Sequence, residues 1–283
     1  MKRALLLAGI AALVLAGTGC KKLQSRDQLN RGVQAFKSAK YDEAIDHFNQ
    51  AVELDPSNPN ARLYLATSYF VQYIPGAVSP ENLEYSRKAR EEFLKVLAQD
   101  PKDRTALQYL ASLAYNEASG TADLESKLKK LDDARDWYLK LIAVDPKNKE
   151  AYYSLGVIDW MKWYPRWMEA LNKQDMKPDQ AMPFKDKKIK AELAEQYGSL
   201  VDDGIKNLQT ALSIDKEYDD AMAYMNLLVR ERASLDDSPE AYKKDIDTAD
   251  DWVQKSLEAK KIKASKQVGN QGITAESTDT PTK

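Results

Sequence analysis

Asp-Pro steps divide the chain at a fixed interval. They occur at Asp55-Pro56, Asp100-Pro101 and Asp145-Pro146, and their prolines lie 45 residues apart both times. Each step closes an apolar run with helical spacing, because proline forces the residue before it toward extended geometry. A fixed period of this size is typical of stacked helical units that bury their apolar faces only against their neighbours. The sequence therefore predicts an α-solenoid, a fold that usually binds other molecules and rarely catalyses a reaction.

The composition fits a helical protein with a substantial core. Of the 283 residues, 43% are hydrophobic and 30% are charged, so the chain can bury a core and is not disordered throughout. The formal net charge is −2, and loss of a leader that contains Lys2 and Arg3 would make it −4. Because nucleic-acid binding requires a basic surface, no nucleic acid is expected as a partner.

The first twenty residues have the pattern of an export signal. Two basic residues precede an apolar run at 4–16, and small residues at 17–19 then lead to Cys20, the only cysteine. The apolar run is too short to span a bilayer comfortably. The pattern predicts a signal peptide at 1–19, and a single cysteine excludes an intramolecular disulfide.

This segment resembles a bacterial lipoprotein signal, although Gly17 stands where that motif usually has Leu. The resemblance implies that Cys20 is acylated and becomes the new N-terminus, followed by a short linker at 20–24. It further implies a periplasm-facing protein of the cell envelope, held by acyl chains that bind a membrane almost permanently. Lys21, rather than Asp, at the second mature position favours the outer membrane. Ordinary secretion and an uncleaved anchor remain alternatives.

The first repeat has a characteristic spacing of small and aromatic residues. These residues are Gly32, Ala44, Phe48, Ala51 and Pro56. Gly and Ala let two helices approach, and the phenylalanine fills the space beside them. The spacing resembles the tetratricopeptide repeat (TPR), a helix-turn-helix unit of 34 residues. The resemblance implies an all-α, right-handed α-solenoid whose concave groove binds a protein or peptide, and similar sequences occur among bacterial TPR lipoproteins.

We expect about five TPR-like helix pairs within residues 25–262. The expected ranges of the pairs are 25–58, 59–103, 104–148, 149–218 and 219–262. The second and third pairs exceed the TPR length by 11 residues, so longer helices or a wider turn must absorb the excess. A long insertion is expected in the fourth pair at about 164–190, and the polar tail at 263–283 is expected to be disordered.

Aromatic residues recur along one stripe of the first helices. The candidate groove residues are Phe36, Phe70, Tyr115, Tyr153, Trp160, Trp163 and Trp167. In TPR proteins this stripe lines the concave groove, and a row of rings suits an apolar peptide or helix. Two other interpretations stay open: the rings could pack against the next first helix, or a piece of the chain itself could fill the groove.

Three of the five tryptophans, Trp160, Trp163 and Trp167, lie in one short segment. Leaving three indoles in water would forfeit on the order of 10 kcal/mol, so something must cover them. We expect the insertion to fold back over these rings; the alternative is coverage by a partner protein, a peptide or lipid headgroups. The same insertion carries Lys185, Lys187, Lys188 and Lys190. We interpret these lysines as a solvated face, with contact to anionic lipid as the alternative.

Catalysis is not expected. His47 is the only histidine, so neither a histidine-dependent acid-base pair nor a multi-histidine metal site can form. Acidic pairs such as Asp132-Asp133 and Asp202-Asp203 are better explained by the favourable charge of carboxylates near helix starts. No nucleotide-binding or hydrolase motif occurs, so we expect no cofactor and no metal.

Together these patterns predict a non-enzymatic TPR scaffold or adaptor lipoprotein of the cell envelope. Its partner would be a protein or peptide bound in the aromatic-lined groove, and its membrane contact would be the N-terminal lipid. An alternative is a fixed structural subunit of an envelope assembly machine, such as outer-membrane barrel assembly or pilus biogenesis. An enzyme is the remote alternative.

Overall fold

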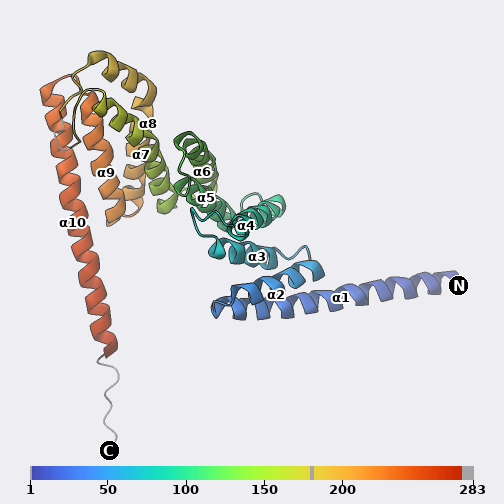
Figure 1. Ribbon diagram of the computed structural model, residues 1–283. Helices are drawn as coiled ribbons and strands as arrows, with labels where there is room; N and C mark the ends of the chain where they lie inside the picture. Colours follow the sequence, from blue (N-terminus) through green and yellow to red (C-terminus); the bar gives the residue numbers. More distant parts are fainter. Residues whose placement is uncertain (1, 179–181, 276–283) are drawn as a thin grey trace, which may run out of the picture. The chain divides into compact units, whose positions relative to one another are not determined.

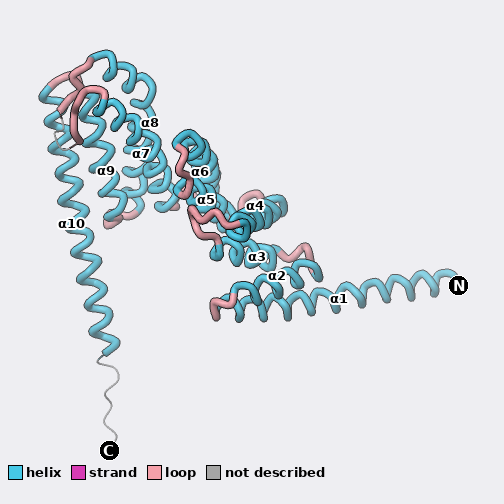
Figure 2. Tube along the Cα trace, in the orientation of Figure 1, coloured by secondary structure: helices cyan, strands magenta, loops and turns pink. Residues whose placement is uncertain are grey.

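The computed structural model describes residues 2–178 and 182–275, with side chains described for 20–178 and 182–266. The helices are α1 (Lys2–Lys37), α2 (Tyr41–Leu54), α3 (Pro59–Gln72), α4 (Pro80–Gln99), α5 (Arg104–Ser119), α6 (Leu124–Val144), α7 (Lys149–Asn172), α8 (Lys187–Ile214), α9 (Asp219–Arg232) and α10 (Pro239–Ala275), with a 3₁₀ turn, η1 (Ala233–Leu235), after α9. Within the described residues no strand occurs (Figures 1 and 2). The all-α prediction is confirmed.

The helices pack as five pairs that fall into two compact units. The N-terminal unit, Met1–Val144, contains the pairs α1/α2, α3/α4 and α5/α6, and the C-terminal unit, Asp145–Lys283, contains α7/α8 and α9/α10. Inside each unit the second helix of one pair packs against the first helix of the next: α2 on α3, α4 on α5, and α8 on α9. This serial packing is the TPR arrangement, and the number of pairs agrees with the sequence.

One kind of turn joins successive pairs at four junctions. The backbone N–H of the third residue after an aspartate donates to the aspartate carbonyl: Asn58 to Asp55, Asp103 to Asp100, Asn148 to Asp145 and Tyr218 to Asp215, at 3.1 to 3.3 Å. At Asp55, Asp100 and Asp215 the side-chain carboxylate also accepts the N–H two residues on. Since the aspartate makes these bonds, the turn forms equally at Asp215-Lys216, where the proline is absent.

The same turns start the following helices. The side chains of Asn58, Asp103 and Asn148 each accept a backbone N–H from the first turn of α3, α5 and α7, respectively. A cap of this kind satisfies one of the N–H groups that a helix start leaves without a partner and stabilises the helix by about 1 kcal/mol. One short segment thus ends one helix and begins the next.

The extra residues of the second and third pairs are absorbed in different ways. In the second pair they are shared between a longer second helix, since α4 has 20 residues, and a wide turn at 73–79, where the Asn82 side chain binds the backbone of Ile74 and the carbonyl of Ala77. Gly76 in this turn has a φ of 82° and lies against Gly120. In the third pair the helices are longer: α5 has 16 residues and α6 has 21, against 14 in α2 and in α3.

The fourth pair absorbs most of its extra residues as helix. The sequence predicts an insertion between the two helices at about 164–190; instead, α7 continues through Pro165 to Asn172, and α8 begins at Lys187. The link between them is held by the Phe184 N–H, which donates to the Ser234 carbonyl at 2.9 Å. The insertion therefore lengthens the helices, which have 24 and 28 residues.

Both ends of the chain extend the terminal helices. Helix α1 begins at Lys2, so it contains the expected leader and the 20–24 linker. Helix α10 continues to Ala275, beyond the expected start of a disordered tail at 263, while 276–283 lie outside the described residues. Among the described residues, no helix has both the length and the apolar character required to cross a membrane.

Small residues set the distance between paired helices. A Cβ atom on Gly32 would lie 2.5 Å from a ring carbon of Phe48, a fully buried side chain, and a Cβ atom on Gly156 would lie 2.6 Å from Leu208. Contacts this short do not occur in folded proteins, so each glycine is required for the close approach of its pair. The role of Gly32 agrees with the TPR-like spacing of the sequence.

Replacing Gly156 by alanine should therefore destabilise the C-terminal unit. The added methyl group overlaps Leu208, and overpacking of this kind costs about 1–3 kcal/mol, which exceeds the gain in helix propensity. We expect a lower unfolding midpoint for Gly156→Ala, measured by circular dichroism in urea.

The matched control is Gly198→Ala in the interior of α8. Apart from the adjoining residues and backbone of α8 itself, no atom lies within 4 Å of a Cβ atom built on Gly198. Alanine at this position should therefore increase the free energy of unfolding by about 0.5–1 kcal/mol and raise the urea midpoint. A Gly156→Ala protein at least as stable as the Gly198→Ala protein would contradict the packing described for α7 and α8.

Candidate partner-binding surface

A continuous row of aromatic side chains, which we call the aromatic row, runs along α7 and α9 of the C-terminal unit. In order of contact it contains Tyr218, Tyr153, Tyr224, Trp160 and Tyr164, with centroids of successive rings 5.0, 5.7, 5.4 and 5.0 Å apart. All five side chains are partly exposed. The spacing is that of edge-to-face and tilted ring pairs, which hold one another in place. The row therefore presents a preformed apolar surface.

The carboxyl group of Glu231 lies beneath this row. The Trp160 Nε1–H donates to Glu231 Oε1 at 3.0 Å, and the glutamate is only 4% exposed. Its other oxygen, Oε2, is buried and makes no hydrogen bond of ordinary geometry. Burial raises the pKa of Glu231 to about 8, against the smaller lowering effects of the Trp160 and Trp163 indoles. The group is therefore mostly protonated at neutral pH and fixes the orientation of Trp160.

Two of the candidate groove residues, Trp163 and Trp167, lie in the core. They are 0% and 5% exposed, so they cannot offer a surface to a partner. Met176, Phe184 and Leu193, from the link and α8, belong to the same core cluster. Trp167 also donates through Nε1 to Ser234 Oγ at 3.0 Å. The chain itself covers these rings, as the preferred interpretation of the sequence held, and only Trp160 of the three faces outward in part.

The candidate groove residues of the N-terminal unit are occupied by contacts within the chain. Phe36 packs on Tyr64 of α3, with centroids 6.4 Å apart, and Phe70 packs on Tyr109 of α5 at 4.9 Å. Both tyrosines in turn stack on a buried phenylalanine of a second helix. Tyr115 is partly buried, and burial raises its pKa. These contacts match the alternative in which the rings pack against the next first helix.

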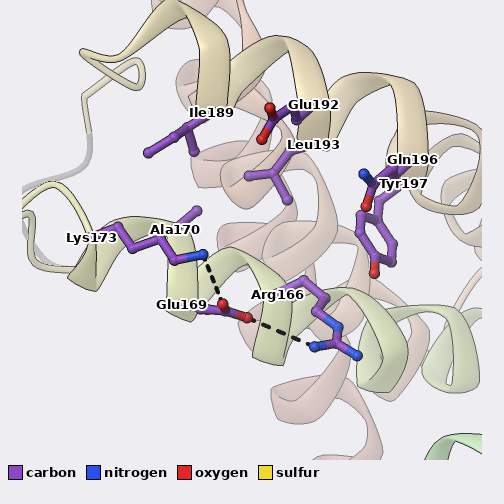
Figure 3. Close-up of a pocket in the computed structure, with 9 residues that line it drawn as sticks. All are labelled: Arg166, Glu169, Ala170, Lys173, Ile189, Glu192, Leu193, Gln196 and Tyr197. Carbon is purple, nitrogen blue, oxygen red and sulfur yellow. Dashed lines mark ion pairs between the residues drawn. The ribbon is translucent and has the colours of Figure 1, made fainter.

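A cleft of about 260 Å³ lies between the extended parts of α7 and α8 (Figure 3). Arg166, Glu169 and Lys173 line it from α7, and Glu192 and Tyr197 line it from α8. Glu169 pairs with Lys173 at 2.8 Å and with Arg166 at 3.7 Å, and the bond to Lys173 lowers its pKa. Because Arg166 and Lys173 already contact the Glu169 carboxylate, their charges are less available to an anionic ligand in the cleft.

The remaining sequence candidates are polar surface groups. His47 Nδ1 lies 2.7 Å from the side-chain oxygen of Gln28. Lys190 pairs with Asp237, while Lys185, Lys187 and Lys188 are exposed. Cys20 is exposed on α1. Within the residues that the structure describes, no three His, Cys, Asp or Glu side chains converge on a possible metal position.

The sequence did not single out Tyr218 and Tyr224 of the aromatic row, nor Glu231 beneath it. Glu231 lies in an acidic and basic run, Arg230-Glu231-Arg232, which reads as solvated helix surface. Its two neighbours do point to carboxylates: Arg230 to Asp250 at 2.5 Å and Arg232 to Asp245 at 2.8 Å. One signal in the sequence could have indicated that Glu231 is buried. It lies three residues after Leu228, which lies three residues after Met225, so it continues the apolar face of α9.

Stability of the C-terminal unit should fall as the pH rises toward 8. The unfolded chain loses the Glu231 proton near the ordinary pKa of 4.5, whereas the folded chain keeps it until about pH 8. Folding therefore becomes less favourable between these values, by up to the order of 5 kcal/mol. The Glu231→Gln protein should lack this loss, as measured by urea midpoints from pH 5 to pH 9.

The control is Glu195→Gln, which makes the same change at an exposed glutamate of α8. It should keep the pH profile of the parent protein. A Glu231→Gln profile that parallels the parent profile would show that the buried carboxyl does not titrate as described.

Comparison with known proteins agrees with the fold. A family model described as TPR repeat matches residues 35–72. The chain is similar to a crystal structure of MamA protein, with 16% identity, a TM-score of 0.51 and coverage of 86% of this chain and 94% of that one. For a second crystal structure of MamA the identity is 17%, the TM-score 0.50 and the coverage 83% and 96%.

A weaker structural similarity is to YrrB, described as a TPR protein with an unusual peptide-binding site. The identity is 16%, the TM-score 0.45 and the coverage 83% of this chain and 90% of that one. No curated protein matches the sequence. The serial helix pairs, the repeat match at 35–72 and the fold shared with MamA show that the chain has the fold of a tetratricopeptide repeat solenoid.

Proposed function

We propose that this protein is a non-enzymatic scaffold or adaptor lipoprotein of the cell envelope, which holds a protein or peptide partner on its aromatic row. The single observation that carries the proposal is the continuous row of five partly exposed rings on α7 and α9. TPR folds typically serve as non-catalytic interaction scaffolds, and stacked repeats create extended binding surfaces.

Recognition on this surface requires little rearrangement. Tyr and Trp side chains have only two side-chain torsions, so they supply contact area at low entropic cost. Each ring of the row touches the next, and Trp160 is also held by its bond to Glu231. A partner that covers a preordered ring keeps more of the binding free energy than one that must first order it.

The anchor proposal comes from the leader. A basic start, a short apolar run and small residues before Cys20 support processing and acylation at this cysteine, which is exposed. Acylation would restrict the protein to a membrane surface and raise its local concentration for partners there. Lys21 supports the outer membrane as the destination.

Removing two rings of the row should weaken partner binding strongly. In the Trp160→Ala/Tyr164→Ala protein we expect loss of about tenfold or more in affinity, because buried aromatic anchors dominate most interfaces. The measurement is crosslinking in native membranes followed by purification, with the recovered partners then titrated against both proteins.

The control is Tyr85→Ala, a partly exposed tyrosine on α4 outside the row. It should retain the partners. Equal recovery by the double variant and the control would refute a role for the row. Stoichiometric comigration of the protein with the same neighbours would instead indicate a fixed subunit of an assembly machine.

Replacing Cys20 by serine should abolish lipid attachment. We expect the parent protein to incorporate alkyne-tagged palmitate and to sediment with membranes, and the Cys20→Ser protein to do neither. Acyl labelling that persists in the variant would disprove attachment at this cysteine. A variant that loses its label but still sediments with membranes would indicate an uncleaved anchor.

A further inference from the structure

Each unit has an apolar pocket lined mostly by side chains of its second helices. The pocket of the N-terminal unit is lined mainly by α4 and α6 and has a volume of about 470 Å³. The pocket of the C-terminal unit is lined mainly by α10, with Leu212 of α8, Met222 of α9 and the turn between these helices, and has a volume of about 360 Å³ (helices labelled in Figure 1).

The two pockets are built from the same positions of two repeats. The first uses Leu97, Pro101, Leu107, Trp137, Lys140 and Val144. Adding 115 to each number gives Leu212, Lys216, Met222, Trp252, Lys255 and Ala259, all of which line the second. The register holds without a gap through the turn, the first helix and the second helix. The pocket is therefore a property of the third and fifth helix pairs and not of one irregular loop.

Stacking of helix pairs does not require the tryptophan. The positions equivalent to Trp137 in the first, second and fourth pairs hold His47, Glu92 and Asn207. Each of these makes a polar contact with the first helix of its own pair: His47 with Gln28 at 2.7 Å, Glu92 with Arg62 at 2.5 Å and Asn207 with Asp159 at 3.4 Å. Among these five equivalent positions, tryptophan therefore stands at the two that line the pockets described here.

A lysine ammonium group lies over each of these tryptophans. Lys140 Nζ is 3.9 Å from the Trp137 ring centroid, and Lys255 Nζ is 4.4 Å from that of Trp252. Among the described residues, neither lysine has a carboxylate within ion-pair distance. Lys95, at the same position in the second pair, pairs instead with Glu92 at 2.5 Å. Each pocket thus combines an apolar floor with a lysine that makes no ion pair. The lining of the second pocket also includes Glu258 and Glu217, of which Glu217 pairs with Lys266 at 2.6 Å.

From this combination we infer that the two pockets bind acidic amphipathic peptide segments of a partner protein. An apolar side chain of the segment would pack on the tryptophan, and a neighbouring Asp or Glu would pair with the lysine. Helices recognised in grooves carry their anchors one turn apart, which matches an anchor and a carboxylate separated by three or four residues. Charge complementarity would select such segments over basic ones.

The two pockets should differ in strength. The second has Glu258 on its rim, where the first has Ala143. A carboxylate at this place opposes an acidic segment and weakens the pull of Lys255. The pocket of the N-terminal unit should therefore bind an acidic segment more tightly than the second pocket does.

The test uses the full chain in phosphatidylcholine nanodiscs and a displayed library of random short peptides as the probe. We expect enriched peptides to carry an apolar anchor with Asp or Glu within one helical turn. Synthetic versions should bind about two- to fivefold more weakly to the Lys140→Gln/Lys255→Gln protein, since exposed ion pairs contribute modestly. Loss of the apolar floor in Trp137→Ala/Trp252→Ala should weaken binding about tenfold or more.

Two control variants keep the outcome specific. Lys95→Gln changes the equivalent lysine of the second pair, which pairs with Glu92, and it should leave peptide binding unchanged. Trp160→Ala/Tyr164→Ala should also leave it unchanged, so failure of the pockets and failure of the aromatic row can be told apart. Thermal unfolding by circular dichroism identifies any variant that has lost its fold, and the lysine variants, which alter exposed side chains, are the primary evidence.

Several results would overturn the inference. They are enrichment of peptides without acidic residues, binding to the lysine variant as tight as to the parent, and no enriched binder at all. A further contrary result could come from sedimentation equilibrium. If the parent protein self-associates and the Trp137→Ala/Trp252→Ala protein does not, a second copy of this chain fills the pockets.

Discussion

The aspartate turn between helix pairs is the contact on which the rest of the structure depends. Its carbonyl stops one helix, and the residue three positions on starts the next, at Asp55, Asp100, Asp145 and Asp215. Because the turn is short and repeated, successive first helices within a unit contact one another: α1 and α3, α3 and α5, and α7 and α9. Surfaces built from one position of several helices, such as the aromatic row and the two Trp-Lys pockets, follow from this regular placement.

The fourth pair shows how such a scaffold gains a local surface. Helices α7 and α8 run well beyond the length of α2 and α3, and the link between them returns over Trp163 and Trp167. These indoles extend the core of the C-terminal unit to the end of the pair. Trp160, one turn earlier, then stands at the boundary between this core and the solvent. Its position is set by the buried rings behind it and by the tyrosines on either side.

Much of the fold could be predicted from the sequence, because small residues and turn residues act locally. The spacing of Gly32 and Phe48 identified the first pair, and the Asp-Pro steps identified the next junctions. The site was harder to predict. Residues three and four apart share a helix face, so Trp160, Trp163 and Trp167 form one stripe in sequence, and tertiary packing alone decides which of them stays exposed. The extent of α7 was also missed, since Pro165 favours a helix end but is accommodated within α7.

The buried carboxyl of Glu231 explains why this stripe divides where it does. At the corresponding position of the third pair the chain has Asn116, a side chain that can bind polar groups without carrying a charge. In the fifth pair the protonated Glu231 carboxyl is likewise uncharged. It accepts a hydrogen bond from the Trp160 N–H and also lies near the buried indole of Trp163. Ionisation would place a charge between the surface ring and the buried rings, where little water can stabilise it. The protonation state of one residue therefore couples the packing of the extended fourth pair to the orientation of the ring at the centre of the aromatic row.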